Sequence, residues 1–523
     1  MITKFLKTQG RQIVTEDGQP ILLKGWGIGN WLLQEGYMWQ AHGQLFDRPR
    51  RIEQTIADLT DQEFAQDFWQ AYRDNYFTEA DVAYIHQQGY NSLRLPFNAS
   101  LFLDDAGEVD ERNFYLMDQA IAWAKKYDLY VWIDMHGAPG GQTGANIDDS
   151  IGDVPNLYLV PEYWHQALQL WQFIARRYAD EPAVAGYDLL NEPIRPGNDH
   201  LQDFDYLLPK LAQFYDEAIA KIRAVDARHM FSLEGYHWAS DPSVFNHHYD
   251  DNYVIHFHRY GVLPSQETFA EFLAVSRQYD VPLWLGETGE NNDRWFAGMA
   301  QLCEANQVSR HFWTYKKMGR QNSGVTVKTP DNWSLIMDYL QTGRKPAASQ
   351  VKTILADYLD NIKFANCLPN PDVDRHILLK PPVTYAAVNF SEVPGSYRGA
   401  TARSNFVKYH QGKNLDIIVP DLQQPGQSTF DVHLDDYRLR LHESEFVTYT
   451  FWNQAPAKQV QLWFDDQLTA ANSQIQVVVN DQEIFAGPLV GIDLQLPLAQ
   501  LTQVNVKIVV ISGVVGLAKI NLF

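Results

Sequence analysis

The feature that most constrains the fold is a regular alternation of strand-like and helical segments that continues as far as residue 350. Strand-like runs recur eight times, and helix-sized stretches separate them, apart from a shorter link between residues 235 and 253. Repeated strand–helix units imply a parallel sheet, and eight units favour a closed (β/α)8 barrel. The expected strands are 21–31, 90–97, 130–137, 184–190, 229–235, 253–260, 281–289 and 310–317.

The pattern changes after Pro369, where short runs of alternating apolar and polar residues replace the strand–helix units. Turn residues separate these runs and no helical period is evident, which is typical of a β-sandwich or jelly roll. The sequence therefore predicts an α/β barrel in residues 1–366, a proline-containing linker in 367–382 and an all-β sandwich in 383–523.

The net charge of −22 argues against nucleic acid and anionic membranes as partners, since both would repel such a surface. The two cysteines, Cys303 and Cys367, are too few and too distant for a disulfide framework or a zinc site. The first twenty residues lack the apolar core of a signal peptide, and no apolar run is long enough to span a membrane. A cytoplasmic protein is expected, unless a leader has been removed, and the oligomeric state stays open.

Polar side chains gather where the expected strands end. In a parallel barrel the carboxyl ends of all strands meet at one mouth, which is where active sites of this fold lie. Several such residues together, two carboxylates among them, indicate a site better than any one of them would. They are Arg94, His136, Asn191, Glu192, His256, His258, Tyr260, Glu287, Trp313 and Tyr315.

Glu192 and Glu287 form the chemical core of this set. Hydrolysis of a glycoside needs one carboxylic acid to protonate the leaving oxygen and a second carboxylate to attack the anomeric carbon or to activate water. Arg94 beside Glu287 would keep that carboxylate ionised, and Asn191 can hydrogen-bond a sugar 2-hydroxyl. His258 and Tyr260 share one face of their strand and are expected to orient Glu287.

Other chemistries have weaker support. His256 and His258 form an H-x-H pair that could bind a metal, but no third ligand stands out. The Gly-rich stretch 136–144 lacks the Lys-Ser/Thr of a phosphate-binding loop, and no Gly-x-Ser-x-Gly elbow for an esterase is present. The sequence therefore predicts no metal and no cofactor.

The set of motifs "LRLPF", "WIDMHGAPGGQTG", "YDLLNEP", "HFHRY", "LWLGETGE" and "FWTYKK" resembles glycoside hydrolase family 5. That resemblance implies a retaining mechanism with Glu192 as acid/base and Glu287 as nucleophile. Either His256 or His258 fills the family's histidine position, and either Trp313 or Tyr315 forms the aromatic floor. The remaining matches to the family's active-site positions are Arg94, His136, Asn191 and Tyr260.

Two stretches resemble the exo-β-glucanase branch of this family. In "GNWLLQEGYM" the residue that would grip the terminal sugar is Glu35, and in "HGAPGGQTGANIDDS" it is Asp148 or Asp149. A carboxylate at the end of the pocket would block a long chain, so we expect an exo-acting β-glycosidase on short β-glucans or β-glucosides, with small oligosaccharides as its partners. An endo-glucanase, a β-mannosidase and a glycolipid glycosidase are the alternatives within the family, and a non-catalytic sugar-binding protein is the alternative outside it.

Two further segments are open to two interpretations each. The insertion 37–75 carries Trp39 and Trp69, which either line the pocket or fill the core of extra helices. The C-terminal sandwich resembles carbohydrate-binding modules, and either binds sugar or serves as a scaffold.

Overall fold

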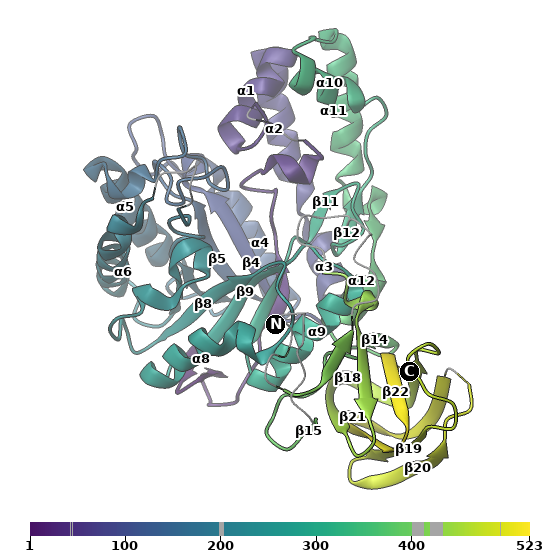
Figure 1. Cartoon of the computed structure of the whole chain (residues 1–523). Coiled ribbons are helices and arrows are strands. Elements are labelled where there is room, and N and C mark those ends of the chain that lie inside the picture. Colours follow the sequence, from purple (N-terminus) through teal and green to yellow (C-terminus); the bar gives the residue numbers. More distant parts are fainter. Residues whose placement is uncertain are drawn as a thin grey trace. The chain divides into compact units, whose positions relative to one another are not determined.

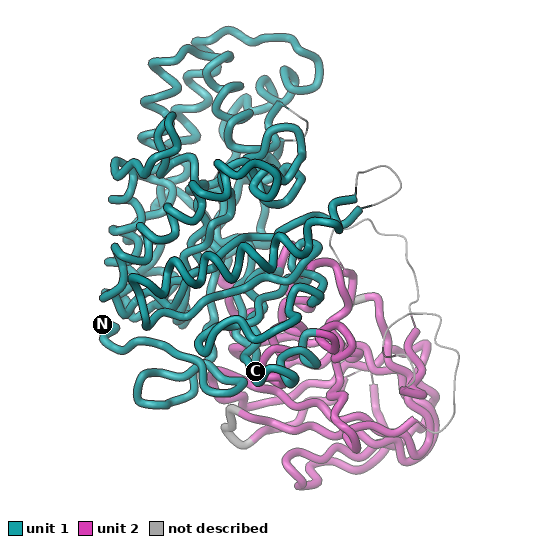
Figure 2. Tube along the Cα trace, turned by 90° about the vertical axis from the view of Figure 1, so that its left-hand side faces the viewer, with its two compact units in different colours: residues 1–259, 272–288, 308–370 teal, residues 260–271, 289–307, 371–523 magenta. Residues whose placement is uncertain are grey.

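A computed structural model describes residues 1–41, 43, 45–197, 203–399, 410, 413–418, 432–491 and 493–523. The chain divides into two compact units, which Figure 2 colours separately. Unit 1 comprises residues 1–259, 272–288 and 308–370, and unit 2 comprises residues 260–271, 289–307 and 371–523.

Within the described residues, eight strands close into a barrel in the order β10-β3-β4-β5-β6-β7-β8-β9, and each pairing for which a register is given is parallel (Figure 1). This confirms the predicted (β/α)8 fold. The observed strands are shorter than the sequence pattern at several ends. Their bounds are β3 Lys24–Gly27, β4 Ser92–Asn98, β5 Tyr130–Gly137, β6 Val184–Asp188, β7 Met230–Glu234, β8 Tyr253–Arg259, β9 Leu283–Gly289 and β10 Ser309–Trp313.

Helices connect successive barrel strands, as a parallel sheet requires. The connection between β7 and β8 is the exception, since it holds only the four-residue α7 and a 3-10 turn, in agreement with the short link in the sequence. The connecting helices are α3 Glu79–Gln88, α4 Phe114–Lys126, α5 Pro161–Tyr178, α6 Leu208–Arg223, α7 Tyr236–Ala239, α8 Gln266–Tyr279 and α9 Asp293–Asn306.

Large rings fill the barrel interior, and glycines on neighbouring strands make room for them. The rings of Trp132 and Trp284 stack with their centroids 4.5 Å apart. A Cβ atom at Gly186 would lie 2.6 Å from the Trp132 ring, and one at Gly286 would lie 1.9 Å from Nε2 of His256. Both distances are below van der Waals contact, so these two positions accept only glycine while the rings stay in place.

The insertion between β3 and β4 forms helices α1 (Pro49–Leu59) and α2 (Gln62–Tyr76), and α2 packs with α11 (Ala348–Asn361), which follows α10 (Ser334–Thr342). Trp39 and Trp69 are buried among the aromatic side chains of this layer. The Trp39 ring lies 5.4 Å from that of Tyr72 and 4.6 Å from that of Tyr358. Both tryptophans therefore have a core position rather than one facing a pocket.

Unit 2 contains the predicted antiparallel β-sandwich, in which the long strands β18 and β21 pair with each other and β22 pairs with β18, β17 and β14. Alternating buried residues along β18, such as Val447, Tyr449 and Phe451, supply its core. The strands are β14 Val383–Ala386, β15 Tyr397–Arg398, β16 Asp416–Ile418, β17 Arg438–His442, β18 Phe446–Phe464, β19 Gln474–Val479, β20 Gln482–Pro488, β21 Asp493–Ser512 and β22 Val514–Leu522.

The segment 367–382, expected as a linker, carries secondary structure of its own. Strand β13 (Leu368–Pro369) pairs with β12 (Val325–Val327), which in turn pairs with β11 (Lys316–Met318). Helix α12 (Pro371–Ile377) follows β13 and buries Val373 and Ile377. The other small sheet is the hairpin of β1 (Leu6–Gln9) and β2 (Gln12–Thr15). No helix in the described part of the chain is long and apolar enough to cross a membrane.

Candidate active site

Arg94 on β4 lies at the centre of the candidate site and is fully buried. Its guanidinium forms ion pairs with carboxylates from four other barrel strands. The distances are 2.6 Å from Nη1 to Glu287, 2.9 Å from Nε to Asp188, 3.0 Å from Nη2 to Glu234 and 3.1 Å from Nη2 to Asp134. A buried guanidinium can stay charged at such a position because each of its edges faces an acceptor.

The chain makes a strained turn where β6 ends. Glu192 has a φ of +42° and Ile194 a φ of +56°, both in the left-handed region that residues other than glycine rarely adopt. Pro193 between them cannot donate a backbone hydrogen bond, so the strand cannot continue. The backbone N–H of Glu192 donates instead to Oε2 of Glu234 at 2.7 Å. Strain of this kind is common where a side chain has to face a reacting group.

The carboxyl group of Glu192 is the most exposed of the cluster, with 14 % of its side chain accessible. Its Oε1 lies 2.8 Å from Nδ1 of His258. Burial, followed by the negative charges of Glu287 and Glu35, raises the pKa of Glu192 well above its ordinary value. Glu192 is therefore suited to carry a proton in neutral solution.

Glu287 on β9 has the opposite environment. Its Oε2 pairs with the Arg94 guanidinium, which stabilises the negative charge of the carboxylate. Carboxyl oxygens of Glu192 and Glu287 lie within 4.8 Å of each other and of a ring nitrogen of His258. The structure thus brings together one carboxyl group that favours its proton and one that is paired with a cation.

His136, Asn191 and Trp313 lie beside this pair. The amide oxygen of Asn191 accepts from Arg94 at 2.8 Å, and its amide nitrogen lies 3.2 Å from Nε2 of His136. The His136 ring stacks on Trp313 with centroids 5.1 Å apart, and the Trp313 indole N–H donates to the Tyr37 hydroxyl at 2.8 Å. Burial and then the charge of Arg94 lower the pKa of His136 to about 3, so this ring is neutral.

The loop after β5 is held in place by hydrogen bonds to the site and by hydrogen bonds within the loop itself. Gln142 donates to the backbone carbonyls of His136 and Asn191, each at 2.8 Å, and so links the loops that follow β5 and β6. Asp148 is completely buried, and the hydrogen bonds of its carboxylate come from Gln142, Thr143 and Ser150 of the same loop. The contacts observed for Asp148 therefore organise the loop.

Asp149 is also engaged in protein contacts, since it accepts from the backbone and side chain of Arg50 and from Asn98 at 2.9 to 3.2 Å. Glu35 is buried and directly precedes the 3-10 helix Gly36–Trp39. Its negative charge is one of those that raise the pKa of Glu192, which places it near the carboxylate pair.

Two expectations about individual side chains differ from the structure, and a third is left untested. His258 hydrogen-bonds Glu192, whereas the sequence suggested that it would orient Glu287. Tyr315 points away from the cluster, and its hydroxyl donates to the buried Asp81 at 3.2 Å, because the chain turns after Trp313. Tyr260 directly follows β8, is half-buried and falls in unit 2, so the expected link to Glu287 stays a prediction.

The sequence interpretation missed three members of the cluster, which are Asp134, Asp188 and Glu234. Asp134 lies within β5, whereas Asp188 and Glu234 are the last residues of β6 and β7. A charged residue in a largely apolar strand was the signal that could have found them. Burial raises the pKa of Asp134 and of Glu234 well above the ordinary values. For Asp188 the nearby His256 and Arg94 outweigh burial and lower the pKa. The carboxyl groups around Arg94 therefore differ in how strongly each favours its protonated form.

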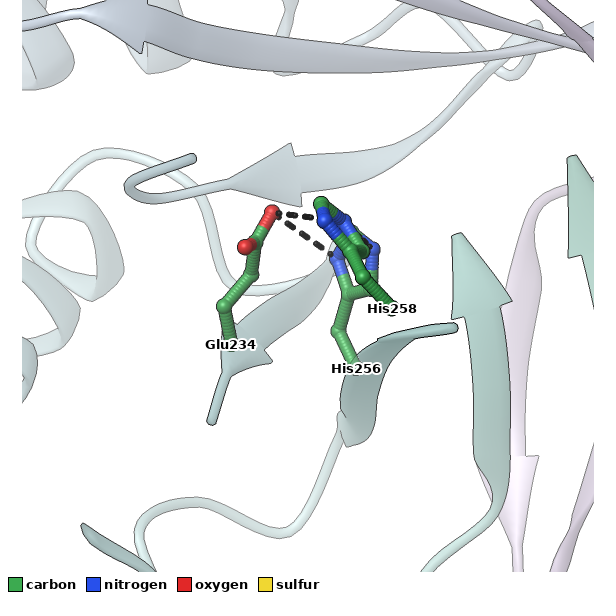
Figure 3. Close-up of side chains that lie close together, drawn as sticks. All are labelled: Glu234, His256 and His258. Atoms are coloured by element: carbon green, nitrogen blue, oxygen red, sulfur yellow. Dashed lines mark hydrogen bonds and ion pairs between the residues drawn. The ribbon is translucent and has the colours of Figure 1, made fainter. Parts of the chain in front are cut away.

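Glu234, His256 and His258 present ligand atoms within 4.8 Å of one another, close enough in spacing for a metal ion (Figure 3). The donor set does not suit one, however. Oε1 of Glu234 accepts from the Arg94 guanidinium at 3.0 Å, so a fixed positive charge already occupies this oxygen and would repel a cation. The three residues are instead part of a hydrogen-bonded network.

A parallel barrel whose mouth carries a close pair of carboxyl groups, one favouring its proton and one paired with arginine, has the arrangement used by barrel glycoside hydrolases. Residues 57–319 match the family described as Cellulase (glycosyl hydrolase family 5). The chain belongs to this family and is a glycoside hydrolase.

Three relatives illustrate the range of the similarity. A beta-xylosidase of Phanerodontia chrysosporium is 27% identical over 64% of this chain and 76% of its own length. A glucan 1,3-beta-glucosidase of Schwanniomyces occidentalis is 27% identical over 48% of this chain and 60% of its own. Endoglucanase C of Acetivibrio thermocellus is 27% identical over 37% of this chain and 53% of its own. The last two matches thus span little more than half of the relatives' length.

Proposed function

We propose that the protein is a retaining β-glycoside hydrolase that removes terminal β-glucosyl residues from short β-glucans or β-glucosides. The observation that carries the retaining mechanism is the separation of Glu192 and Glu287, whose carboxyl oxygens lie within 4.8 Å of each other. Retaining enzymes keep their two carboxyl groups about 5–5.5 Å apart, whereas inverting enzymes leave roughly 6.5–9.5 Å for a water molecule.

In the first step Glu287 attacks the anomeric carbon while Glu192 protonates the leaving oxygen. The bond between the sugar and the leaving oxygen breaks, and a covalent glycosyl-enzyme forms on Glu287. The ion pair with Arg94 supports this role because it keeps the nucleophile charged and fixed in position. The raised pKa of Glu192 supports the role of acid, since the group holds its proton until the leaving oxygen needs it.

In the second step Glu192, now a carboxylate, takes a proton from water, which attacks the anomeric carbon and frees Glu287. Asn191 is assigned to the sugar 2-hydroxyl, because Arg94 fixes its amide oxygen and so turns its N–H groups away from the guanidinium. Trp313 is assigned to the face of the sugar ring, and His136, stacked on it, to a neighbouring hydroxyl.

Exo action is supported by the contacts that hold the loop after β5 in place. Arg48 donates to the backbone oxygen of Ser150 and pairs with Asp153, and Arg50 pairs with Asp149, so the loop after β5 is fastened to the start of α1. The buried Glu35 adds a carboxylate near Glu192. A fixed loop and a carboxylate at the end of the pocket would stop a long chain from passing. The name of the Schwanniomyces relative, a glucosidase, agrees with this proposal.

An endo-glucanase is the second candidate, favoured by the match to Endoglucanase C. The two candidates differ in their first products. We would incubate the enzyme with a soluble β-glucan hexasaccharide, separate the early products by anion-exchange chromatography, and follow the anomer formed by proton NMR. Exo action predicts glucose and a pentasaccharide from the start, with β-glucose appearing first. Early di- to tetrasaccharides would contradict exo action, and α-glucose as first product would contradict retention.

The identity of the sugar is tested in the same way with a panel of aryl β-glycosides. We expect the glucoside to be hydrolysed faster than the xyloside and the mannoside. Preference for the mannoside, or activity only on glycolipids, would replace the glucosyl assignment without changing the roles of Glu192 and Glu287.

A further inference from the structure

A chain of hydrogen bonds runs from Glu192 into the barrel through two histidines. Oε1 of Glu192 lies 2.8 Å from Nδ1 of His258, and Nε2 of His258 lies 3.0 Å from Nε2 of His256. Nδ1 of His256 then lies 3.1 Å from Oδ1 of Asp188. Figure 3 shows both imidazole rings beside the same carboxyl oxygen of Glu234. Each ring thus has a polar partner at both nitrogens.

His256 is fixed in this chain and is closed off from solvent. Its side chain is completely buried, the Trp284 ring lies 4.1 Å away, and the absence of a side chain at Gly286 makes room for its Nε2. It therefore cannot reach a sugar, in contrast to its expected place among the substrate-binding residues. His256 can therefore act on the reaction only through its neighbours, of which His258 is the one that contacts Glu192.

The order of donors and acceptors along the chain follows from its inner end. The Asp188 carboxylate also accepts from Ser232 at 2.8 Å and from Nε of Arg94, so it acts as an acceptor toward His256 as well. His256 then carries its proton on Nδ1 and presents a lone pair at Nε2. His258 must donate to that lone pair from its own Nε2, which leaves Nδ1 of His258 as an acceptor. The group facing it, Oε1 of Glu192, has to be the donor.

We propose that Asp188 and His256 are positioning residues that fix the tautomer of His258 and thereby keep a proton on Glu192 in the resting enzyme. This inference rests on the proposed role of Glu192 as the acid. A hydrogen bond that only the neutral carboxylic acid can donate favours that form over the carboxylate. The histidine pair thus keeps Glu192 protonated in the resting enzyme.

The charges around His256 agree with a neutral ring. Asp188 of β6 and Glu234 of β7 face it with carboxyl groups, while Arg94 of β4, His258 of its own strand and His311 of β10 are the basic groups around it. Burial outweighs the carboxylates and lowers the pKa of His256 to about 4. Burial, and then His256, lower the pKa of His258 well below its ordinary value.

This arrangement accounts for the proton that Glu192 gives up and later regains. When the leaving group departs, the O–H bond of Glu192 breaks and the proton bonds to the leaving oxygen. The carboxylate that remains faces the lone pair of His258 Nδ1 and gains no donor from it, so it is the stronger base toward the incoming water. The proton taken from that water restores the resting state, and neither histidine changes its charge.

The test compares two uncharged substitutions at one position. In His256→Gln the amide can donate to Asp188 and accept from His258, as the imidazole does. In His256→Phe it can do neither, so His258 is free to move its proton to Nδ1 and donate to Glu192. We would measure kcat/KM on phenyl β-glucoside against pH, because its basic limb reports the pKa of the acid in the free enzyme. The carboxyl signal of Glu192 would be titrated in parallel by 13C NMR without substrate, with assignment from Glu192→Gln.

For His256→Phe we expect both the basic limb and the NMR midpoint of Glu192 to move down by about one pH unit, and for His256→Gln we expect both to stay near the wild type. A loss of activity in His256→Phe at every pH without movement of either midpoint would overturn the inference, since a structural role alone would do that.

A shift of the basic limb of the wild-type enzyme on treatment with EDTA, reversed by Zn2+, would also overturn the inference, because the two Nε2 atoms would then hold a cation. Wild-type enzyme inactive on every aryl glycoside would count against the proposed function instead, and the NMR midpoints would still decide the tautomer question.

Discussion

Arg94 and Glu287 form an ion pair of 2.6 Å between two strands that are not neighbours in the barrel. The same guanidinium binds Asn191, which precedes Glu192 in the chain. One buried cation therefore sets the position of the proposed nucleophile and of the turn that carries the proposed acid.

Glu192→Ala should reduce hydrolysis according to how much the leaving group needs a proton. On phenyl β-glucoside we expect kcat/KM to fall by about 10²–10⁴-fold, and on 2,4-dinitrophenyl β-glucoside, whose leaving group needs no acid, by much less. Steady-state kinetics on the two substrates check this. The exposed Glu162 offers a matched control, because Glu162→Ala should leave both rates unchanged. An equal loss on both substrates would remove Glu192 from the role of acid.

Arg94→Lys should destabilise the protein strongly, because a lysine cannot reach the four carboxylates that the guanidinium pairs with. Buried carboxylates left without a partner cost about 3–5 kcal/mol in the free energy of unfolding. Urea unfolding followed by circular dichroism measures the difference. Arg112→Lys is the control, since that side chain is 84% exposed and we expect a change below about 0.5 kcal/mol. Similar values for the two variants would show that the buried cluster does not depend on Arg94.

Gly286→Ala should displace His256, because the new Cβ atom would lie 1.9 Å from its Nε2. We expect a loss of about 1–3 kcal/mol in the free energy of unfolding together with a lower kcat/KM. At Gly487 on β20 a Cβ atom would meet only the Phe485 ring, at 3.8 Å. Gly487→Ala should therefore be tolerated. If thermal unfolding and kinetics of Gly286→Ala match those of the wild type, His256 is not packed as tightly against Gly286 as the structure indicates.

His311 should make stability depend on pH in a predictable direction. Burial, reinforced by the charge of Arg94, lowers the pKa of His311 well below the ordinary value of about 6.5. Between these two pKa values the unfolded chain binds one proton more than the folded protein, so the contribution of His311 to stability is lost as the pH falls.

Relative to the uncharged His311→Gln, the wild type should lose about 1.5 kcal/mol more in its free energy of unfolding between pH 6.5 and pH 5. Urea unfolding of both proteins at the two pH values measures this difference. Parallel pH dependence in the two proteins would mean that His311 binds the same number of protons in the folded and unfolded states, so that folding does not lower its pKa.

The sequence predicted the barrel because the period of its strand–helix units is a local property. Each strand-like run is several residues long, and the turn residues between runs are visible in the chain. The same reasoning placed Glu192 and Glu287 at strand ends, since Pro193 and the glycines of "LGETGE" mark where those strands stop. The three residues Asp134, Asp188 and Glu234 escaped because each belongs to a largely apolar strand and the role of its charge depends on Arg94, which lies on a different strand.

Sequence alone thus determined the architecture, the family and the candidate carboxylate pair, because these depend on residue types and on their spacing along the chain. Only the tertiary structure decided that His258 contacts Glu192 instead of Glu287, that Tyr315 faces Asp81, and that Asp148 holds its own loop. Those contacts join residues from different strands or loops. Their partners depend on closure of the barrel and on the direction in which each buried side chain can pack without leaving a polar group unsatisfied.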